Sequence, residues 1–343
     1  MSRAISQKRQ DTPSLQPLLD MLAEPMAAVN ETIIARLHSD VPLIPELGGH
    51  LIAAGGKRMR PLLTLAGAHL AGADADGMAK AVKLATAVEF IHSATLLHDD
   101  VIDESSLRRG RDTANALWGN DASVLVGDFL FARSFELMVE TGNIGVLGRL
   151  SAAAARITEG EIKQMAITGA PDTPLSDYMD VITGKTAILF AAAAAAGAEV
   201  ASGSETDVAV MHDYGMKLGL AFQIMDDALD YAAVAEDTGK NAGDDFADQK
   251  ITMPTIIAWQ NADDEEKSFW QRTLGDADFA EGDLARAQAI LARHDAIGQS
   301  LAAAREHATS ASQMIIAHCD TGPKVEIGTA LAEAAAFAAA RSS

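Results

Sequence analysis

Cysteine, aromatic residues and positive charge are all scarce in this 343-residue sequence. The single cysteine, Cys319, excludes an internal disulfide framework and is typical of a protein from a reducing compartment. The 27 lysine and arginine residues are outnumbered by 48 aspartate and glutamate residues, so the net charge is −21. A nucleic-acid surface needs clustered positive charge, which argues against nucleic acid as a partner.

Long apolar runs are also missing. The longest, AILFAAAAAAGAEV at residues 187–200, is mostly alanine and is shorter than the roughly 18 residues that span a bilayer. We expect it to form a buried, closely packed helix. The first ten residues, MSRAISQKRQ, lack the apolar core of a secretory signal, so we expect a soluble, cytoplasmic protein.

Helix-forming residues, in contrast, are abundant. The chain is 48% hydrophobic but only 5% aromatic, and it is rich in alanine and leucine, which predicts an all-α protein. We expect a flexible arm at residues 1–15 and a single all-helical domain at 16–343. We also expect a helix break near Pro25, punctuation at Gly48 and Gly49, and a long irregular loop at 233–251. Further helices are expected at 78–103, 121–141, 145–169, 175–200, 205–232, 252–260, 264–275, 283–294 and 297–317.

Two aspartate motifs follow strongly apolar stretches: HDDVID at residues 98–103 and MDDALD at 225–230. On a helix, Asp99 and Asp103 lie one turn apart on one face, with His92 about two turns back. Such a face can offer several carboxylate oxygens to a hard divalent cation. A solvated helix end is the alternative for one motif alone, but repulsion between carboxylates at the mouth of a core favours cations.

The second motif repeats the geometry of the first. Asp226 and Asp230 share a face, Asp227 is offset by one step, and Gln223 lies one turn back. The segment DDFAD at residues 244–248 has the same spacing, but a chain this acidic produces such matches by chance. The sequence therefore leaves the importance of this third match open.

Basic residues occur in short clusters beside glycines: GGKRMRP at 55–61, RRGR at 108–111, and the pairs 184–185 and 239–240. Arginine offers a planar fork to phosphate oxygens, and glycine lets backbone approach an anion. No P-loop spacing and no Ser–His–Asp or Cys–His arrangement stands out. Together these features indicate metal-assisted ionisation of a diphosphate ester.

A series of motifs follows in order along residues 50–255: GGKRMRP, LLHDDVID with SSLRRG, GKTA, FQIMDDALD and GKNAGDDFADQKITMP. With these motifs in this order, the sequence resembles the trans-prenyltransferases. These are the head-to-tail isoprenyl diphosphate synthases. The resemblance implies an isoprenoid-synthase-type antiparallel helical bundle around a deep central cavity, Mg²⁺ as cofactor, and a homodimer. It implies isopentenyl diphosphate and an allylic diphosphate as substrates, joined by loss of diphosphate, carbon–carbon bond formation and proton loss.

The resemblance also implies roles for individual residues. Residues implied to act in catalysis are Asp99, Asp100, Asp103, Lys185, Asp226 and Lys240, and those implied to bind metal are Asp99, Asp100, Asp103, Asp226, Asp227 and Asp230. Residues implied to hold the allylic diphosphate are Arg108, Lys185, Thr186, Gln223 and Lys240. Lys250 is implied to be a further substrate-binding residue. The residues that match positions binding isopentenyl diphosphate are Lys57, Arg60, His92 and Arg109.

Product length is expected to depend on Ala94 and Thr95, which lie about a turn before Asp99. The family's short-product enzymes carry bulky aromatics there, whereas both residues are small here. We therefore expect a long-chain product of about eight to ten isoprene units, of the kind used for quinone side chains, over geranylgeranyl or farnesyl diphosphate. Candidates for a deeper floor are Phe131, Leu137 and Met138.

Three other interpretations explain less of the sequence. An HD-type metal phosphohydrolase would use His98 and Asp99 but leaves the second aspartate motif and GGKRMRP without a role. A terpene cyclase typically lacks a GGKRMRP-type site for a second substrate. A non-catalytic synthase subunit tends to lose one aspartate motif, and both are present. A greasy product also suggests peripheral membrane contact during its release.

Overall fold

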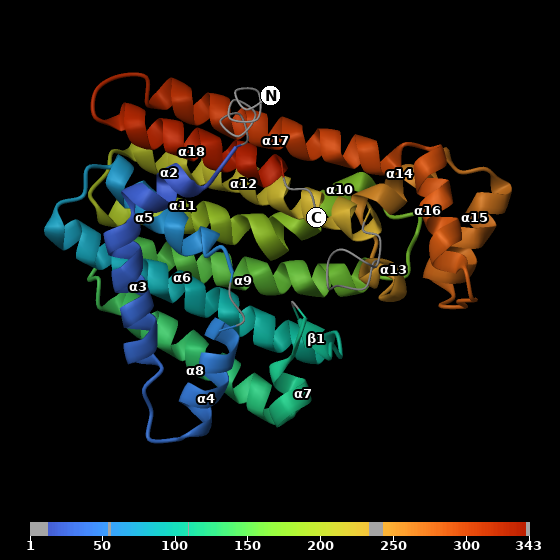
Figure 1. The fold of residues 1–343 in the computed structure, drawn as a ribbon, viewed down its shortest axis with the longest axis horizontal. Helices are drawn as coiled ribbons and strands as arrows, with labels where there is room; N and C mark the ends of the chain where they lie inside the picture. Colours follow the sequence, from blue (N-terminus) through green and yellow to red (C-terminus); the bar gives the residue numbers. More distant parts are fainter. Residues whose placement is uncertain (1–12, 54–55, 109, 233–242, 341–343) are drawn as a thin grey trace, which may run out of the picture.

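The computed structural model describes residues 13–53, 56–108, 110–232 and 243–340. Residues 1–12 of the expected arm, together with Arg109 and Lys240, lie outside the described residues. Within them the chain folds as a bundle of long helices, as the composition predicts, with a two-stranded antiparallel hairpin, Leu107–Arg108 (β1) and Arg111–Asp112 (β2), at one side (Figure 1).

The helices of the first half of the chain end at residue 200, where the alanine-rich run stops. They are α2 (Gln16–Met21), α3 (Ala23–Arg36), α4 (Leu43–Ala53), α5 (Met59–Leu70), α6 (Ala75–Ile102), α7 (Ala114–Trp118), α8 (Asn120–Val139), α9 (Ile144–Ile167), α10 (Leu175–Ile182), the π-helical turn η1 (Thr183–Ala187) and α11 (Ile188–Val200).

The second half begins with one of the two longest helices and ends in an antiparallel pair. Its elements are α12 (Glu205–Ala232), α13 (Asp244–Ala247), α14 (Met253–Asn261), α15 (Asp264–Trp270), the π-helical turn η2 (Gln271–Gly275), α16 (Asp283–Arg293), α17 (Ala296–His318) and α18 (Lys324–Ala339).

Several local expectations need correction. The first helix breaks at Leu22 and not at Pro25, which lies in the first turn of α3, where a proline costs no hydrogen bond. Gly48 and Gly49 lie inside α4, and a side chain at Gly48 would collide with Leu37. Helix α18 was not expected at all. The segment around RRGR forms the hairpin and not only a loop.

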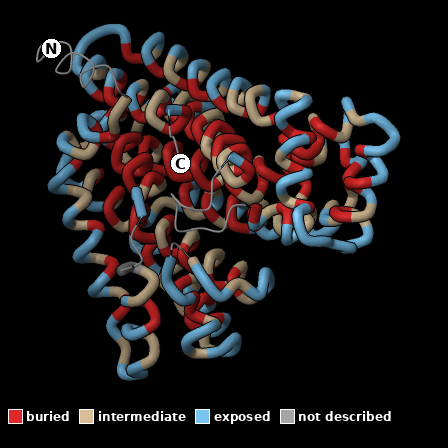
Figure 2. The backbone as a smooth tube through the Cα atoms, turned by 45° about the vertical axis from the view of Figure 1, so that its right-hand side comes forward, coloured by how far each residue is buried: buried red, intermediate tan, exposed pale blue. Residues whose placement is uncertain are grey.

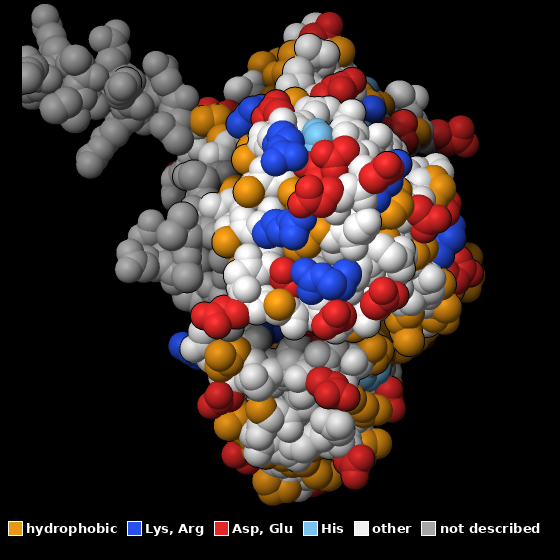
Figure 3. Space-filling view, turned by 90° about the vertical axis from the view of Figure 1, so that its right-hand side faces the viewer, with side chains coloured by type: hydrophobic (Ala, Val, Ile, Leu, Met, Phe, Trp, Pro, Cys, Tyr) orange, Lys and Arg blue, Asp and Glu red, His pale blue; other side chains and the backbone are white. Residues whose placement is uncertain are grey.

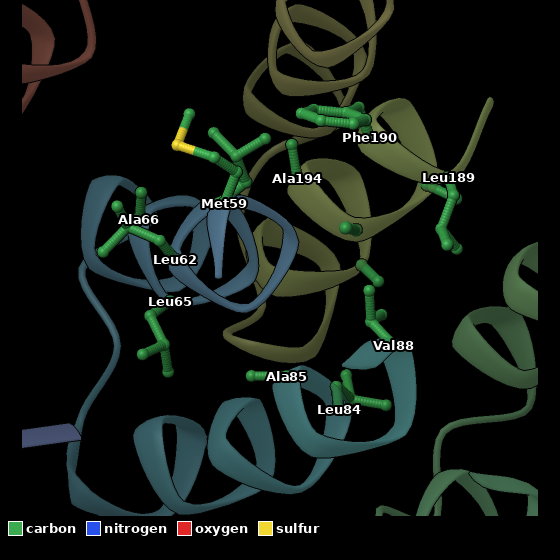
Figure 4. Close-up of a cluster of buried hydrophobic side chains, with 14 of the residues drawn as sticks. Met59, Leu62, Leu65, Ala66, Leu84, Ala85, Val88, Leu189, Phe190 and Ala194 are labelled. Atoms are coloured by element: carbon green, nitrogen blue, oxygen red, sulfur yellow. The ribbon is translucent and has the colours of Figure 1, made fainter. Parts of the chain in front are cut away.

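The apolar run at 187–200 becomes α11, which is buried along almost all of its length. Buried residues fill the interior of the bundle and exposed ones lie on its outside (Figure 2). Helix α11 packs on α5 and α6 through side chains such as Leu62, Val88 and Phe190 (Figure 4). A Cβ at Gly197 would overlap the backbone of Thr64, so glycine is what lets α11 and α5 approach so closely. This confirms the expected close-packed helix.

The same segment is the one candidate for a membrane span in the described part of the chain. Residues 175–200 are long and apolar enough, but 83% of an apolar 18-residue stretch within them is buried inside the bundle. A buried helix of this kind is the core helix of the fold, because its apolar surface is already covered by protein.

Helices α6 and α12 are the longest elements, at 28 residues each, and both carry an aspartate motif at the carboxyl end. These ends lie on the side of the bundle that also holds β1, α10 and α13 (Figure 1). Beyond them, α14 to α16 enclose a second core cluster around Trp270. On the face shown in Figure 3, acidic side chains lie among the basic ones and Lys and Arg form no continuous patch there.

Candidate active site

Two adjoining cavities lie where α6 and α12 end. The larger, of about 400 Å³, is lined by Lys57, Arg60 and His92, which are three of the residues implied to bind isopentenyl diphosphate. The second, of about 340 Å³, is lined by residues of both aspartate motifs. The cavities share a wall that consists of Arg60, His92, Leu96, Arg108 and Phe222.

The second cavity, called the aspartate cavity below, gathers residues from segments far apart in the sequence. Asp99 and Asp103 reach it from α6, and Asp226 and Asp227 reach it from α12. The facing carboxylates are hard oxygen donors, the ligand type that divalent cations of the Mg²⁺ class require. Lys185, Thr186, Gln223 and Lys250 also line this cavity.

Asp100 has a different environment from its neighbours. Its side chain is only 3% exposed, and its Oδ1 accepts a hydrogen bond from Arg108 Nε at 2.8 Å and lies 2.7 Å from Arg108 Nη2. This ion pair fixes Arg108 on β1 at the wall between the two cavities. The structure therefore places Asp100 behind the cavity, where it holds an arginine. Its implied role as a metal ligand is not tested by this arrangement.

The π-helical turn η1 carries Lys185 and Thr186. A π turn contains one residue more than an α turn, and such turns are frequent at functional sites. A side chain at Gly160 on α9 would collide with the backbone of Lys185, so glycine allows η1 to press against α9. There the Lys185 ammonium donates to Glu161 at 2.7 Å, which keeps the cation in the aspartate cavity.

Asp227 accepts a hydrogen bond on each of its two oxygens. The Tyr178 hydroxyl donates to Oδ2 at 2.6 Å and the Gln223 amide donates to Oδ1 at 2.6 Å. Thr186 donates to the Gln223 carbonyl oxygen at 2.7 Å. A continuous set of hydrogen bonds therefore joins α10, η1 and α12.

The segment after α12 closes the aspartate cavity with both signs of charge. Asp245 lines the cavity, and its backbone N–H donates to Asp230 Oδ2 at 3.1 Å. Lys250 donates to Asp103 at 3.1 Å and to Asp248 at 2.9 Å. The third match, DDFAD, thus belongs to the site through Asp245, a residue that the sequence analysis did not select.

Crowding and burial change the acidity of these carboxyls. Burial, reinforced by the negative charge of Glu161, raises the pKa of Asp99 to about 7. Burial raises the pKa of Asp227 to about 6, although the hydrogen bonds from Tyr178 and Gln223 oppose the shift. Burial and the charge of Asp227 also raise the pKa of Asp245. Ionisation of these carboxyl groups is therefore unfavourable until cations enter the cavity.

We expect the metal-free protein to lose stability as pH rises from about 4 to about 7. Asp99 has a folded pKa of about 7 against an ordinary value of 3.8, so the folded state binds the extra proton between those values. The penalty is absent below pH 4 and complete above pH 7. Thermal unfolding in chelator at pH 5 and pH 8 measures it.

Asp99→Asn should flatten this dependence, because the amide carries no charge at either pH. The melting temperature of the variant should then fall by less than that of the wild type between pH 5 and pH 8. Equal falls in the two proteins would show that Asp99 is not one of the titrating groups.

The carboxylate oxygens of this cavity are ligands that suit a divalent cation, although they do not form a complete coordination shell by themselves. No three His, Cys, Asp or Glu side chains converge closely enough to hold a metal in the described part of the chain. The carboxylates instead come from two helices, Asp99 from α6 and Asp226 from α12, and Lys185 and Lys250 line the same cavity. Such a site can hold cations together with the oxygens of an anionic ligand.

The two residues implied to set product length differ in exposure. Thr95 lines the aspartate cavity one turn below Asp99, and its hydroxyl donates to the His92 carbonyl at 2.8 Å. Ala94 is only 1% exposed, lies in the main core cluster and lines neither of the two cavities. Of the floor candidates, Leu137 and Met138 are buried in that core.

Comparison with known proteins agrees with this site. The family model described as Polyprenyl synthetase matches residues 41–291. The octaprenyl diphosphate synthase of Haemophilus influenzae is 40% identical over 308 residues, which cover 90% of this chain and 92% of that protein.

Solved structures are similar over almost the whole chain. A polyprenyl synthase from Caulobacter crescentus, complexed with calcium and isoprenyl diphosphate, has a TM-score of 0.90 and 46% identity, covering 96% of this chain and 99% of that one. A decaprenyl diphosphate synthase from Rhodobacter capsulatus has a TM-score of 0.88 and 46% identity, covering 94% and 98%.

The fold is that of the all-α isoprenoid synthases. The chain belongs to the polyprenyl synthetase family, and it is a trans-prenyltransferase.

Proposed function

We propose that this chain catalyses the Mg²⁺-dependent condensation of isopentenyl diphosphate with an allylic diphosphate, repeated until a long all-trans polyprenyl diphosphate is made. One observation carries the proposal. Carboxylates of both aspartate motifs, Lys185 and Lys250 line one cavity, and this cavity shares a wall with a second cavity that contains Lys57 and Arg60. Two diphosphates can therefore be held side by side.

The aspartate cavity is the proposed site of the allylic substrate. Its diphosphate would contact Arg108, Lys185 and Thr186, and Lys240, which lies outside the described residues, would join them. Asp99, Asp103, Asp226 and Asp227 would hold Mg²⁺, which when bound supplies positive charge that offsets the charge developing on the departing diphosphate. The use of Mg²⁺ agrees with the calcium in the Caulobacter structure.

The larger cavity is the proposed site of isopentenyl diphosphate. Lys57, Arg60 and His92 would hold its diphosphate, and Arg109 would complete the set from outside the described residues. The apolar part of the shared wall, Leu96 and Phe222, would then guide its double bond toward the allylic carbon while keeping water away. The allylic carbon–oxygen bond would break first and release diphosphate, and the double bond of isopentenyl diphosphate would then attack the allylic cation to form the carbon–carbon bond. The departing diphosphate would take up the proton that is lost.

We propose a product of about eight to ten isoprene units. Thr95 beneath Asp99 is small and faces the aspartate cavity, so position 95 itself puts no aromatic ring in the path of the growing chain. The octaprenyl and decaprenyl diphosphate synthases among the relatives support this length. Products of this size fit a role in quinone side chains.

We also propose that the chain works as a cytoplasmic homodimer, with residues 16–343 as one unit. Large apolar side chains on the neighbouring helices α8 and α9 support a partner surface: Leu125, Val139, Ile144 and Ile162 are all more than 60% exposed. Such a surface also suits transient contact with a membrane during product release. Nucleic acid has no part in the proposal.

Removal of the metal tests the proposed reaction. Purified chain with labelled isopentenyl diphosphate, an allylic primer and Mg²⁺ should convert the label to solvent-extractable product, chelator should abolish the conversion, and added Mg²⁺ should restore it. Phosphate release from nucleotides without isopentenyl diphosphate would instead indicate an HD-type phosphohydrolase. Inactivity of the folded chain with a range of primers would indicate a non-catalytic subunit.

A further inference from the structure

Tyr178 is a buried side chain at the site that the reaction described above does not use. It lies on α10, is 1% exposed, and lines the aspartate cavity with its hydroxyl 2.6 Å from Asp227 Oδ2. The tyrosine hydroxyl is the donor and the Asp227 carboxylate is the acceptor in this contact.

The direction of the neighbouring hydrogen bonds is also fixed. Thr186 donates to the carbonyl oxygen of Gln223, so the Gln223 amide nitrogen is turned toward Asp227 Oδ1. With a donor on each oxygen, the Asp227 carboxylate cannot rotate without losing a hydrogen bond. Each carboxylate oxygen has a second lone pair, so the group can accept both hydrogen bonds and still face a cation.

We propose that Tyr178 is a positioning residue of the second aspartate motif, which together with Gln223 orients the Asp227 carboxylate toward the divalent cation in the aspartate cavity. The inference rests on the proposed function, because it assumes that the motif holds a cation. A donor behind a metal-binding group fixes the orientation of that group, and its loss typically weakens metal affinity by about 10- to 100-fold.

Tyr214 offers a matched control on α12. It is also fully buried, and its hydroxyl donates at 2.7 Å, but to the Leu331 backbone carbonyl, and it lines neither cavity. Removing either hydroxyl leaves a buried acceptor with one hydrogen bond fewer, so both variants should lose stability, and Tyr178→Phe should lose more because its acceptor is a carboxylate. Only Tyr178→Phe should alter cation binding.

The test measures Mn²⁺ binding by electron paramagnetic resonance in the presence of inorganic diphosphate. Tyr178→Phe should raise the Mn²⁺ dissociation constant by about tenfold or more, and Tyr214→Phe should leave it within about twofold. In the Asp227→Asn background, Tyr178→Phe should have no further effect, because its action passes through that carboxylate. The KM for isopentenyl diphosphate should stay unchanged in Tyr178→Phe.

The outcomes separate this inference from the function on which it rests. No Mn²⁺ binding by the wild type with diphosphate would overturn the proposed function. Wild-type binding with an unchanged dissociation constant in Tyr178→Phe would overturn only the role of Tyr178. If Tyr178→Phe is too unstable to assay, Gln223→Met removes the hydrogen bond to the other Asp227 oxygen, and unchanged Mn²⁺ affinity there would overturn the inference equally.

Discussion

Replacing Asp99 or Asp226 by alanine should reduce the condensation rate by about a thousandfold or more, with the fold intact. Each substitution removes a carboxylate that faces the aspartate cavity from a different wall. The remaining carboxylates cannot hold the cations in the same place, and the leaving diphosphate then loses most of its charge stabilisation. Steady-state rates with labelled isopentenyl diphosphate and a saturating primer measure the loss.

Two measurements make this prediction specific. Asp213→Ala removes an exposed carboxylate from α12, the helix that also carries Asp226, and should leave the rate within about twofold of the wild-type rate. At pH 8 the melting temperature of metal-free Asp99→Ala should equal or exceed that of the wild type. Burial and the charge of Glu161 raise the pKa of Asp99, so its ionised carboxyl destabilises the folded state at this pH. A folded Asp99→Ala or Asp226→Ala enzyme with wild-type turnover would rule out the metal assignment.

The second large effect is expected at Thr95, where phenylalanine should shorten the product to about three or four isoprene units. Thr95 faces the aspartate cavity about 5.4 Å, one helical turn, below Asp99. A ring at this level would block the chain after a few condensations while the diphosphate sites above it stay unchanged. Chromatography of the dephosphorylated products measures the length distribution, and the first condensation should keep most of its rate.

Thr95→Val is the matched control, because it keeps the volume of the side chain and removes only the hydroxyl that donates to the His92 carbonyl. Its products should be as long as those of the wild type. Ala94→Phe is expected to act in the same direction but with a loss of stability, because Ala94 is packed in the core. An unchanged product spectrum in Thr95→Phe would refute the open-floor account.

Local periodicity was enough to predict which carboxylates of the first aspartate motif share a face, while the family resemblance supplied the roles of the other site residues. The i, i+4 spacing put Asp99 and Asp103 on one face of α6, and both line the cavity. The apolar run at 187–200 was long enough for a helix and too short for a bilayer, and α11 is indeed the core helix. Expectations of this kind depend only on neighbouring residues, so they carry over directly from sequence to structure.

The rest depends on contacts between distant segments. Tyr178 meets Asp227 across 49 positions of sequence, and Glu161 meets Lys185 across 24. Nothing in the sequence immediately around Tyr178 or Glu161 marks these two residues as part of a site. Asp245 did have a motif, but the many acidic residues of the chain made that motif uninformative. The turn η1 was also not predictable, since its extra residue accompanies the close approach of α9 at Gly160.

The length of the wild-type product tests the central proposal most directly. The purified chain should be incubated with Mg²⁺, a short allylic primer and excess labelled isopentenyl diphosphate, and the dephosphorylated products resolved by chain length. We predict a dominant product of about eight to ten isoprene units, with shorter chains only as intermediates. A product that stops at four units or fewer under excess isopentenyl diphosphate would contradict the long-chain assignment.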